Sequence, residues 1–389
     1  MPDAGAQTRR TALRELAWLF LKLGTIGFGG PAAHIAMIED EVVARRRWLT
    51  REQFLDLLGA TNLIPGPNST ELAIHVGHAR AGWAGLLVAG ACFIAPAVAI
   101  VMLCAWAYVH FGGLPEATGL LYGVKPVVIA VVVQALWRLG RTAIRGRGLA
   151  ILAVVAAGAN ALGADELAVL AGSALAAPFL ARSWRRGSQG AGSSAVCGAP
   201  VLGTVAGAAG AAAGAASVGL WPLFAFFLKV GSVLFGSGYV LLAFLRGGLV
   251  HNRGWLTEAQ LLDAVAIGQV TPGPVFTTAT FIGYVLAGAP GAAAATVGIF
   301  LPAFVFVALS GPLVPRLRRS PLAGAVLDGV NAASLALMAV VTMQLVRAAV
   351  PDMLTLALAL TSVVCLLALR LNSTWLVLCG ALAGLVGHR

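Results

Sequence analysis

The chain has 389 residues, of which 59% are hydrophobic and 11% charged, and its mean hydropathy is +0.90. Soluble domains carry about 25% charged residues, so this composition excludes a water-soluble globular protein. The net charge of +11 comes from arginines that lie between apolar runs, which is typical of the positive-inside rule and not of nucleic-acid binding. We therefore predict an all-α polytopic protein in a lipid bilayer, with no nucleic-acid partner.

Six helices are expected in the first half of the chain. The N-terminal residues lead into the first helix without a small-residue cleavage site, so we expect no cleaved signal peptide. GFGGP at 27–31 interrupts the first helix and NLIPGPNS at 62–69 interrupts the second. A proline inside a helix costs about 3 kcal/mol, so Pro-Gly-Pro should stop a helix altogether. The expected helices occupy residues 12–38, 52–79, 83–110, 117–138, 148–163 and 166–182.

The second half of the chain repeats the first. Three motifs recur 207 residues further on: FLKLGTIGFGG (20–30) as FLKVGSVLFGS (227–237), WLTREQFLDLL (48–58) as WLTEAQLLDAV (255–265), and Pro65-Gly66-Pro67 as Pro272-Gly273-Pro274. Such self-similarity is the signature of a duplicated unit. The predicted domains are a first repeat at 1–186, a linker at 187–217 and a second repeat at 218–389.

The arginines indicate that the two repeats face opposite sides of the membrane. The loop 111–117 has no lysine or arginine, whereas its counterpart 311–321 carries three arginines. The next loop reverses this bias, with four arginines between 138 and 147 and only Arg347 in the second repeat. Because basic loops lie in the cytoplasm, this swap predicts inverted repeats with a cytoplasmic N-terminus.

Inversion requires an odd number of crossings between the starts of the two repeats. The linker ends in an Ala/Gly-rich apolar run, 196–217, which is interpreted here as a connecting transmembrane helix. The expected total is then about 12–13 transmembrane segments. Arg45, Arg46 and Arg47 fall on the outer side in this scheme; if segment 12–38 or 52–79 is re-entrant, that loop moves to the inside.

Matched Gly/Pro breaks in both halves are the sequence pattern that marks a transporter site. LFGSG at 234–238 matches GFGGP, and the two Pro-Gly-Pro turns match each other. Irregular backbone at membrane depth is tolerated only where protein or water satisfies its polar groups. Each break should begin a new half-helix whose free N–H groups bind an oxyanion. Packing kinks are the alternative interpretation of any single break.

Charged and polar side chains beside the breaks favour an anion. Lys22 and Lys229 are equivalent lysines inside apolar segments, where a lysine is functional by default unless it snorkels to the membrane surface. Lys125 lies inside the fourth helix opposite the neutral Asn331, which places one extra positive charge beside the pathway. Neutral donors near the breaks include Asn68, Gln269 and Thr277.

Two further patterns contain titratable side chains. Glu71, His75 and His78 share one helical face, as a metal site or proton relay requires, but the second repeat has Thr278, Ile282 and Val285 there. Without support from symmetry, we predict no metal, no cofactor and no catalytic residue. The Thr-x-x-Gln of both WLT motifs predicts a helix capping box, and we expect Asp56 and Asp263, one turn later, to share this structural role.

These motifs resemble the chromate ion transporter family in its long-chain, two-domain form, over essentially the whole chain. The resemblance rests on GFGGP, RWLT, PGPNSTELAIHVGHARAGWAG, FGSGYVLLAFL and AIGQVTPGPVFTTATFIGYVLAGAPGA. It implies efflux of chromate across the bacterial plasma (inner) membrane, with sulfate as a related or competing anion, and resistance to chromate. The second repeat departs from the first where Ser237-Gly238 replaces Gly30-Pro31. The substrate-binding motif residues that carry over are Phe28, Gly29, Gly30, Pro31, Pro65, Gly66, Pro67, Phe235, Gly236, Pro272, Gly273 and Pro274, with Ser237 beside them.

Four functions remain open on the sequence. The first is a chromate exporter, and the second is a sulfate or other oxyanion porter of the same fold. An integral-membrane enzyme and a membrane scaffold are the third and fourth. The sequence favours transport over both, because an enzyme needs a nucleophile or carboxylate cluster and a scaffold has no use for matched helix breaks. The oligomeric state, including a homodimer, is left open.

Overall fold

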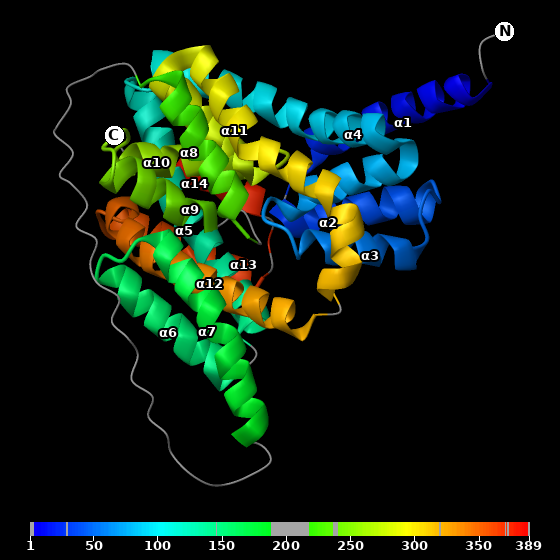
Figure 1. The fold of residues 1–389 in the computed structure, drawn as a ribbon. Coiled ribbons are helices and arrows are strands. Elements are labelled where there is room, and N and C mark those ends of the chain that lie inside the picture. Colours follow the sequence, from blue (N-terminus) through cyan, green and yellow to red (C-terminus); the bar gives the residue numbers. More distant parts are fainter. Residues whose placement is uncertain are drawn as a thin grey trace.

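The computed structural model describes residues 4–28, 30–144, 146–187, 218–235, 240–318, 320–369, 371 and 373–387, and this part of the chain is helical, without β-strands (Figure 1). The first repeat contains α1 (Ala4–Ile26), α2 (Gly30–Glu39), the π-helical turn η1 (Asp40–Arg45), α3 (Arg51–Thr61), α4 (Asn68–Phe111), α5 (Pro115–Ala143), α6 (Arg147–Ala161) and α7 (Glu166–Gly187). The predicted connecting helix 196–217 lies outside the described residues.

The second repeat follows the same order of elements. It contains α8 (Leu220–Val233), α9 (Leu241–Leu245), the π-helical turn η3 (Arg246–His251), α10 (Glu258–Val270), the 3₁₀ turn η4 (Val275–Thr277), α11 (Thr278–Arg318), α12 (Pro321–Ala349), α13 (Met353–Leu367) and α14 (Ser373–Gly387). Both predicted capping boxes are confirmed, with Thr50 and Gln53 at the start of α3 and Thr257 and Gln260 at the start of α10.

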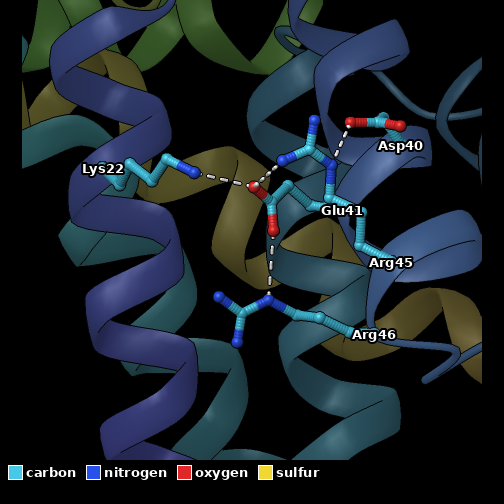
Figure 2. A network of polar contacts seen from close by, with 5 residues as sticks. All are labelled: Lys22, Asp40, Glu41, Arg45 and Arg46. Carbon is cyan, nitrogen blue, oxygen red and sulfur yellow. Dashed lines mark hydrogen bonds and ion pairs between the residues drawn. The ribbon is translucent and has the colours of Figure 1, made fainter.

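The first broken segment is a re-entrant hairpin. α1 ends at Ile26, yet Glu41 of η1 lies beside α1, with its Oε1 2.8 Å from Lys22 Nζ (Figure 2). A straight continuation of the helix would separate these two residues by about 28 Å, at 1.5 Å per residue. The chain therefore turns back at the GFGGP break, and segment 12–38 re-enters.

The second broken segment is also a hairpin, and it opens at the same end. Trp48, in the turn before α3, has the guanidinium groups of Arg46 and Arg80 over its ring, at 5.2 and 5.0 Å from the ring centroid. Arg80 also lies 3.1 Å from Glu15 of α1. Residues 68–80 therefore return to the end from which α3 enters. The Arg45–Arg47 loop lies at this same end, as expected for re-entry.

The long helices α4 and α11 are each folded sharply at an equivalent glycine. Gly82 in α4 has φ +63° and Gly288 in α11 has φ +62°, in the left-handed region that favours glycine. After the kink the two arms of α4 pack closely, because a Cβ on Gly77 would lie 2.2 Å from the carbonyl oxygen of Gly85. The equivalent pair in α11 shows the same close approach. In each long helix, the segment before this glycine is thus one arm of a hairpin, and the segment after it is a long helix that crosses the fold.

The hairpins of the second repeat open at the opposite end. The long arm of α4 starts beside Arg80 and carries Tyr108 near its far end. The Tyr108 hydroxyl donates a hydrogen bond to Asp263 of α10, at 3.0 Å. Because α10 runs from there toward the second Pro-Gly-Pro, its entrance lies at the far end of α4. The two repeats are therefore inverted, as predicted.

The repeats are interlocked through their last helices. α5 of the first repeat packs against α14 of the second, and α12 of the second packs against α7 of the first. Each contact is made at a glycine: a Cβ on Gly123 would lie 1.9 Å from the Gly380 carbonyl oxygen, and one on Gly329 would lie 2.6 Å from that of Ser173. Neither repeat could bury these faces without the other.

The surface of the protein is suited to lipid. Among the described residues, four segments are long and apolar enough to cross a membrane: Asn68–Phe111, Glu116–Ala143, Val275–Ser310 and Pro321–Ala349. Six further apolar helices are 10–17 residues long. Large apolar side chains such as Trp18, Trp83, Val154, Phe179 and Met343 are more than half exposed. A water-soluble surface does not carry so many exposed apolar groups, whereas a bilayer covers them.

Candidate functional site

The two Pro-Gly-Pro turns meet the glycine-rich breaks of the opposite repeat. The amide of Gly66 donates a hydrogen bond of 2.7 Å to the carbonyl of Leu234, and the amide of Gly273 donates one of 2.8 Å to the carbonyl of Gly27. These bonds are equivalent, since both donors and both acceptors are separated by 207 residues. The four breaks therefore meet in pairs at the interface between the repeats.

The turns are buried in protein and do not face lipid. Gly66 and Pro67 are buried, and so are all three residues of the second turn, 272–274. Gly66 has φ +140° and Gly273 has φ +92°, so both need glycine. A Cβ on Gly273 would also lie 2.6 Å from Cβ of Ala97 in α4. Backbone this irregular is stable at membrane depth because neighbouring protein satisfies it.

Each turn leads directly into the N-terminal end of a half-helix. α4 begins at Asn68, one residue after the first turn, and η4 begins at Val275, one residue after the second. The first amides of a helix lack intrahelical partners and carry a partial positive charge. Two such ends at one interface provide paired positions that attract anions without a basic side chain.

The polar groups beside the first turn are unusual in being buried without partners. Asn68 donates from Nδ2 to Asn62 at 2.8 Å, but its Oδ1 and the hydroxyl of Thr70 have no hydrogen-bond partner within the described chain. The same holds for both oxygens of Glu71 and for Nε2 of His75. Glu71 is 0% exposed. A Cβ on Gly66 would lie 2.2 Å from Glu71 Oε1, so this carboxyl group lies against the turn itself.

The second turn is lined by hydroxyl groups that do have partners. Thr277 donates to the Pro274 carbonyl and Thr278 donates to that of Val275, both at 2.8 Å. Gln269 and Thr278 line a cavity of about 10 Å³ beside this turn, which is the volume that one water requires. The two half-sites thus share their backbone geometry but differ in their side chains.

Two of the three predicted lysines form ion pairs with carboxylates, and the third lies within electrostatic range of one. Lys22 is bonded to Glu41, which Arg46 also contacts at 3.1 Å (Figure 2). Lys229 is near enough to Glu166 of α7 to act on it electrostatically.

Lys125 forms the more buried of the two lysine ion pairs. It lies 3.0 Å from Asp263, and the two side chains are 19% and 6% exposed. Both residues and Tyr108 line a cavity of about 300 Å³ that reaches the ends of α4 and α12. Lys125 therefore lines a cavity at one end of the fold. Asp263, expected only as part of a helix cap, is instead its partner.

The remaining predicted residues lie around the glycine-rich breaks. Phe28 is 42% exposed and its amide bonds to the Ile26 carbonyl at 2.9 Å. Gly30 has φ +78° and starts α2, with Pro31 in the first turn where its missing N–H costs nothing. Phe235 follows the Leu234 acceptor and is partly buried. Gly29, Gly236 and Ser237 lie outside the described residues.

Glu71 is the residue at the site that sequence reasoning set aside. It was given no role because the second repeat has a threonine in its place. Its place in the sequence is enough to identify it, because a carboxylate inside an apolar segment costs free energy and is functional by default. Its two histidine neighbours do not complete a metal site, and the described residues contain no cluster of metal-binding side chains.

Residues 14–178 and 221–385 each match the family model described as chromate transporter. The chain belongs to the chromate transporter family. Chromate transport proteins of Cupriavidus metallidurans and Pseudomonas aeruginosa are both 34% identical to it, over 97% and 84% of this chain and 93% and 80% of their own lengths. A probable chromate transport protein of Synechococcus elongatus is 29% identical over 96% of this chain and 95% of its own. No solved structure matches the chain.

The two matches to the chromate transporter family coincide with the geometry of the site. Each matched stretch contains one glycine-rich break and one Pro-Gly-Pro turn, and each turn bonds to the break in the other stretch. Both copies of the family unit are therefore required to build the interface. This arrangement is typical of a multi-pass transporter whose site lies between inverted repeats.

Proposed function

We propose that this protein transports chromate, a tetrahedral oxyanion, out of the bacterial cytoplasm across the plasma membrane and so confers resistance to chromate. The names of its relatives support the substrate, and the fold supports transport over catalysis. The observation that carries the proposal is the reciprocal pair of bonds from Gly66 to Leu234 and from Gly273 to Gly27. They bring two half-helix N-termini to one buried interface, where they stabilise an anion.

We expect two bodies to move during transport. They are the predicted repeats at 1–186 and 218–389, joined by the linker at 187–217. In inverted-repeat transporters one repeat rocks against the other around a fixed central site. In this protein the two hydrogen bonds between the repeats, donated by the amides of Gly66 and Gly273, lie at the centre of this proposed movement. Lys125, on the 300 Å³ cavity, would meet the anion on its route to or from the site.

The direction of transport follows from the membrane potential. Moving one charge across 100 mV is worth about 2.3 kcal/mol. A dianion leaving a negative-inside cell gains about twice that, so export needs no second energy source. The basic end that contains Arg45, Arg46, Arg47 and Arg80 is assigned to the cytoplasm under the positive-inside rule, which places the N-terminus there as well.

Uptake of chromate into inverted membrane vesicles tests the proposal. Vesicles with the protein should accumulate chromate faster than empty vesicles, and unlabelled sulfate should compete. Replacement of Pro65-Gly66-Pro67 by three alanines should abolish uptake, with the protein still present in the membrane. Faster uptake of sulfate than chromate would instead identify a sulfate porter. No uptake of either anion would contradict the proposal.

A further inference from the structure

We infer that Glu71 is a proton-binding gate of the first half-site, so that an oxyanion binds there only when a proton is bound to Glu71. This inference rests on the proposed function, because it concerns the anion site at the first Pro-Gly-Pro turn. It adds a proton to the transport reaction that neither the family match nor the names of the relatives imply.

The position of Glu71 carries the inference. Glu71 lies in the first turn of α4, and its Oε1 is directly against Gly66, the glycine of the turn. Its side chain is fully buried, and neither oxygen has a hydrogen-bond partner within the described chain. A buried carboxylate without a partner is strongly disfavoured in its charged form, so the uncharged acid is the stable species in this arrangement.

The same position explains why the carboxyl group and an oxyanion exclude each other when both are charged. The helix N-terminus attracts one negative charge, and a Glu71 carboxylate at Gly66 would itself be that charge. A second anion at the same turn would meet a like charge in a medium of low dielectric constant, where repulsion is strong. A protonated Glu71 carries no charge and leaves the amides at the start of α4, which lack intrahelical partners, to the anion.

Among the described residues, the groups around Glu71 supply no fixed positive charge to replace the proton. On its own helix, His75 is buried and His78 is exposed. His34 of α2 is held by the Gly27 carbonyl at 2.8 Å, and Asp56 lies on α3. On the elements packed from the other side, Lys22 of α1 is paired with Glu41 and Lys229 of α8 faces Glu166. α11 presents Ala303 to the turn, and its residues 278–310 include only Tyr284 as a titratable group.

The gate exists in only one half-site. The repeat changes register by one residue between Pro67 and Gly77, so Glu71 corresponds to Thr277 or Thr278. Both are threonines whose hydroxyls bond to backbone carbonyls. At this position the second half-site therefore has no group that binds a proton with the anion, and one proton is expected to be held with each anion bound at the first.

Binding of radiolabelled sulfate to the purified full-length protein tests the gate, because sulfate stays a dianion between pH 5.5 and 8.5 and does not itself change charge. For the wild type, the dissociation constant should rise by up to about tenfold per pH unit as Glu71 loses its proton. For Glu71→Gln, a neutral side chain of the same shape, it should be independent of pH. His75→Gln is the matched control on the same helical face, and it should retain the wild-type slope.

A second measurement decides the question even if Glu71→Gln does not fold. In weakly buffered solution with a pH indicator, at a pH where the dissociation constant of the wild type rises with pH and Glu71 is ionised before the anion binds, sulfate binding should take up close to one proton per anion. No proton uptake, or a pH slope that persists in Glu71→Gln, would overturn the gate while leaving anion transport intact. If the wild type binds neither sulfate nor chromate at any pH, the proposed function fails, and the gate fails with it.

Discussion

Lys125 Nζ of the first repeat lies 3.0 Å from Asp263 Oδ1 of the second, and the Tyr108 hydroxyl donates to the other oxygen of the same carboxylate at 3.0 Å. The counterpart of Lys125 in the second repeat is Asn331, which has no charge. The basic side chain on this side of the pathway is therefore neutralised by the opposite repeat in the conformation described.

Replacement of Lys125 by methionine should destabilise the protein by about 3 kcal/mol, because it leaves the 6%-exposed Asp263 without its counter-charge. Adding Asp263→Asn should restore most of that stability, since no buried charge then remains. Thermal unfolding in detergent measures both effects. Chromate uptake should stay low in the stable double variant if Lys125 also meets the anion, and recovery of uptake with stability would limit Lys125 to a structural role.

Replacement of Gly273 by alanine should abolish transport by displacing the second Pro-Gly-Pro turn. The new Cβ would be strained at φ +92° and would lie 2.6 Å from Cβ of Ala97. Gly288→Ala is the matched control, since its φ is +62° but the nearest atom to its Cβ is 3.9 Å away. This control should lose only about 1 kcal/mol and keep transporting.

A second-site change separates the clash from the strain in this turn. Ala97→Gly removes the methyl group that the new side chain meets, so the double variant Gly273→Ala, Ala97→Gly should regain part of the uptake. Vesicle uptake normalised to the amount of protein in the membrane measures this. An inactive double variant with normal stability would show that backbone strain alone disables the turn.

Local sequence predicted the breaks well, because proline and glycine act through their own backbone restrictions. The positions of GFGGP and Pro-Gly-Pro coincide with the helix ends at Ile26 and Thr61. Sequence did not predict which break meets which, because the bond from Gly66 to Leu234 joins residues that only the folded interface brings together. Nor did hydropathy distinguish a re-entrant hairpin from a crossing, since both are apolar for a similar length.

The sequence also did not predict the partners of the charged residues. Asp263 was interpreted through its neighbours in the WLT motif, but it bonds to Lys125 and Tyr108, more than 130 residues away. The repeat does not predict a role for Glu71, because a residue that acts in one repeat alone has no counterpart in the other.

Cysteine labelling should place position 47 on the same side of the membrane as the N-terminus. In a cysteine-free background, Arg47→Cys should react with an impermeant maleimide only from the cytoplasm, and Asn252→Cys, in the equivalent loop of the second repeat, only from outside. The reason is that α1 and α2 form a hairpin whose two ends lie together, beside Glu15 and Arg80. Labelling of position 47 from outside would mean that segment 12–38 crosses the membrane.

Acid should remove the stabilisation that Asp352 provides at the start of α13. This carboxylate, in the loop after α12, accepts a hydrogen bond from the Thr355 amide at 2.9 Å and another from the Tyr122 hydroxyl of the first repeat. The pKa of Asp352 is held below its ordinary value, mainly by the hydrogen bond from the Thr355 amide and next by that from the Tyr122 hydroxyl. Because the folded state favours the ionised form, the stabilisation is complete above about pH 4 and is lost as the pH falls through the lowered pKa.

Asp352→Ala should therefore lower the thermal midpoint of the detergent-solubilised protein at pH 7, and the gap to the wild type should close as the pH is lowered from 4 toward 3. Tyr122→Phe removes one donor and keeps the helix cap, so its effect at pH 7 should be smaller and should also shrink in acid. A gap that stays constant from pH 7 to pH 3 would show that the loss comes from packing of the Asp352 side chain and not from its charge.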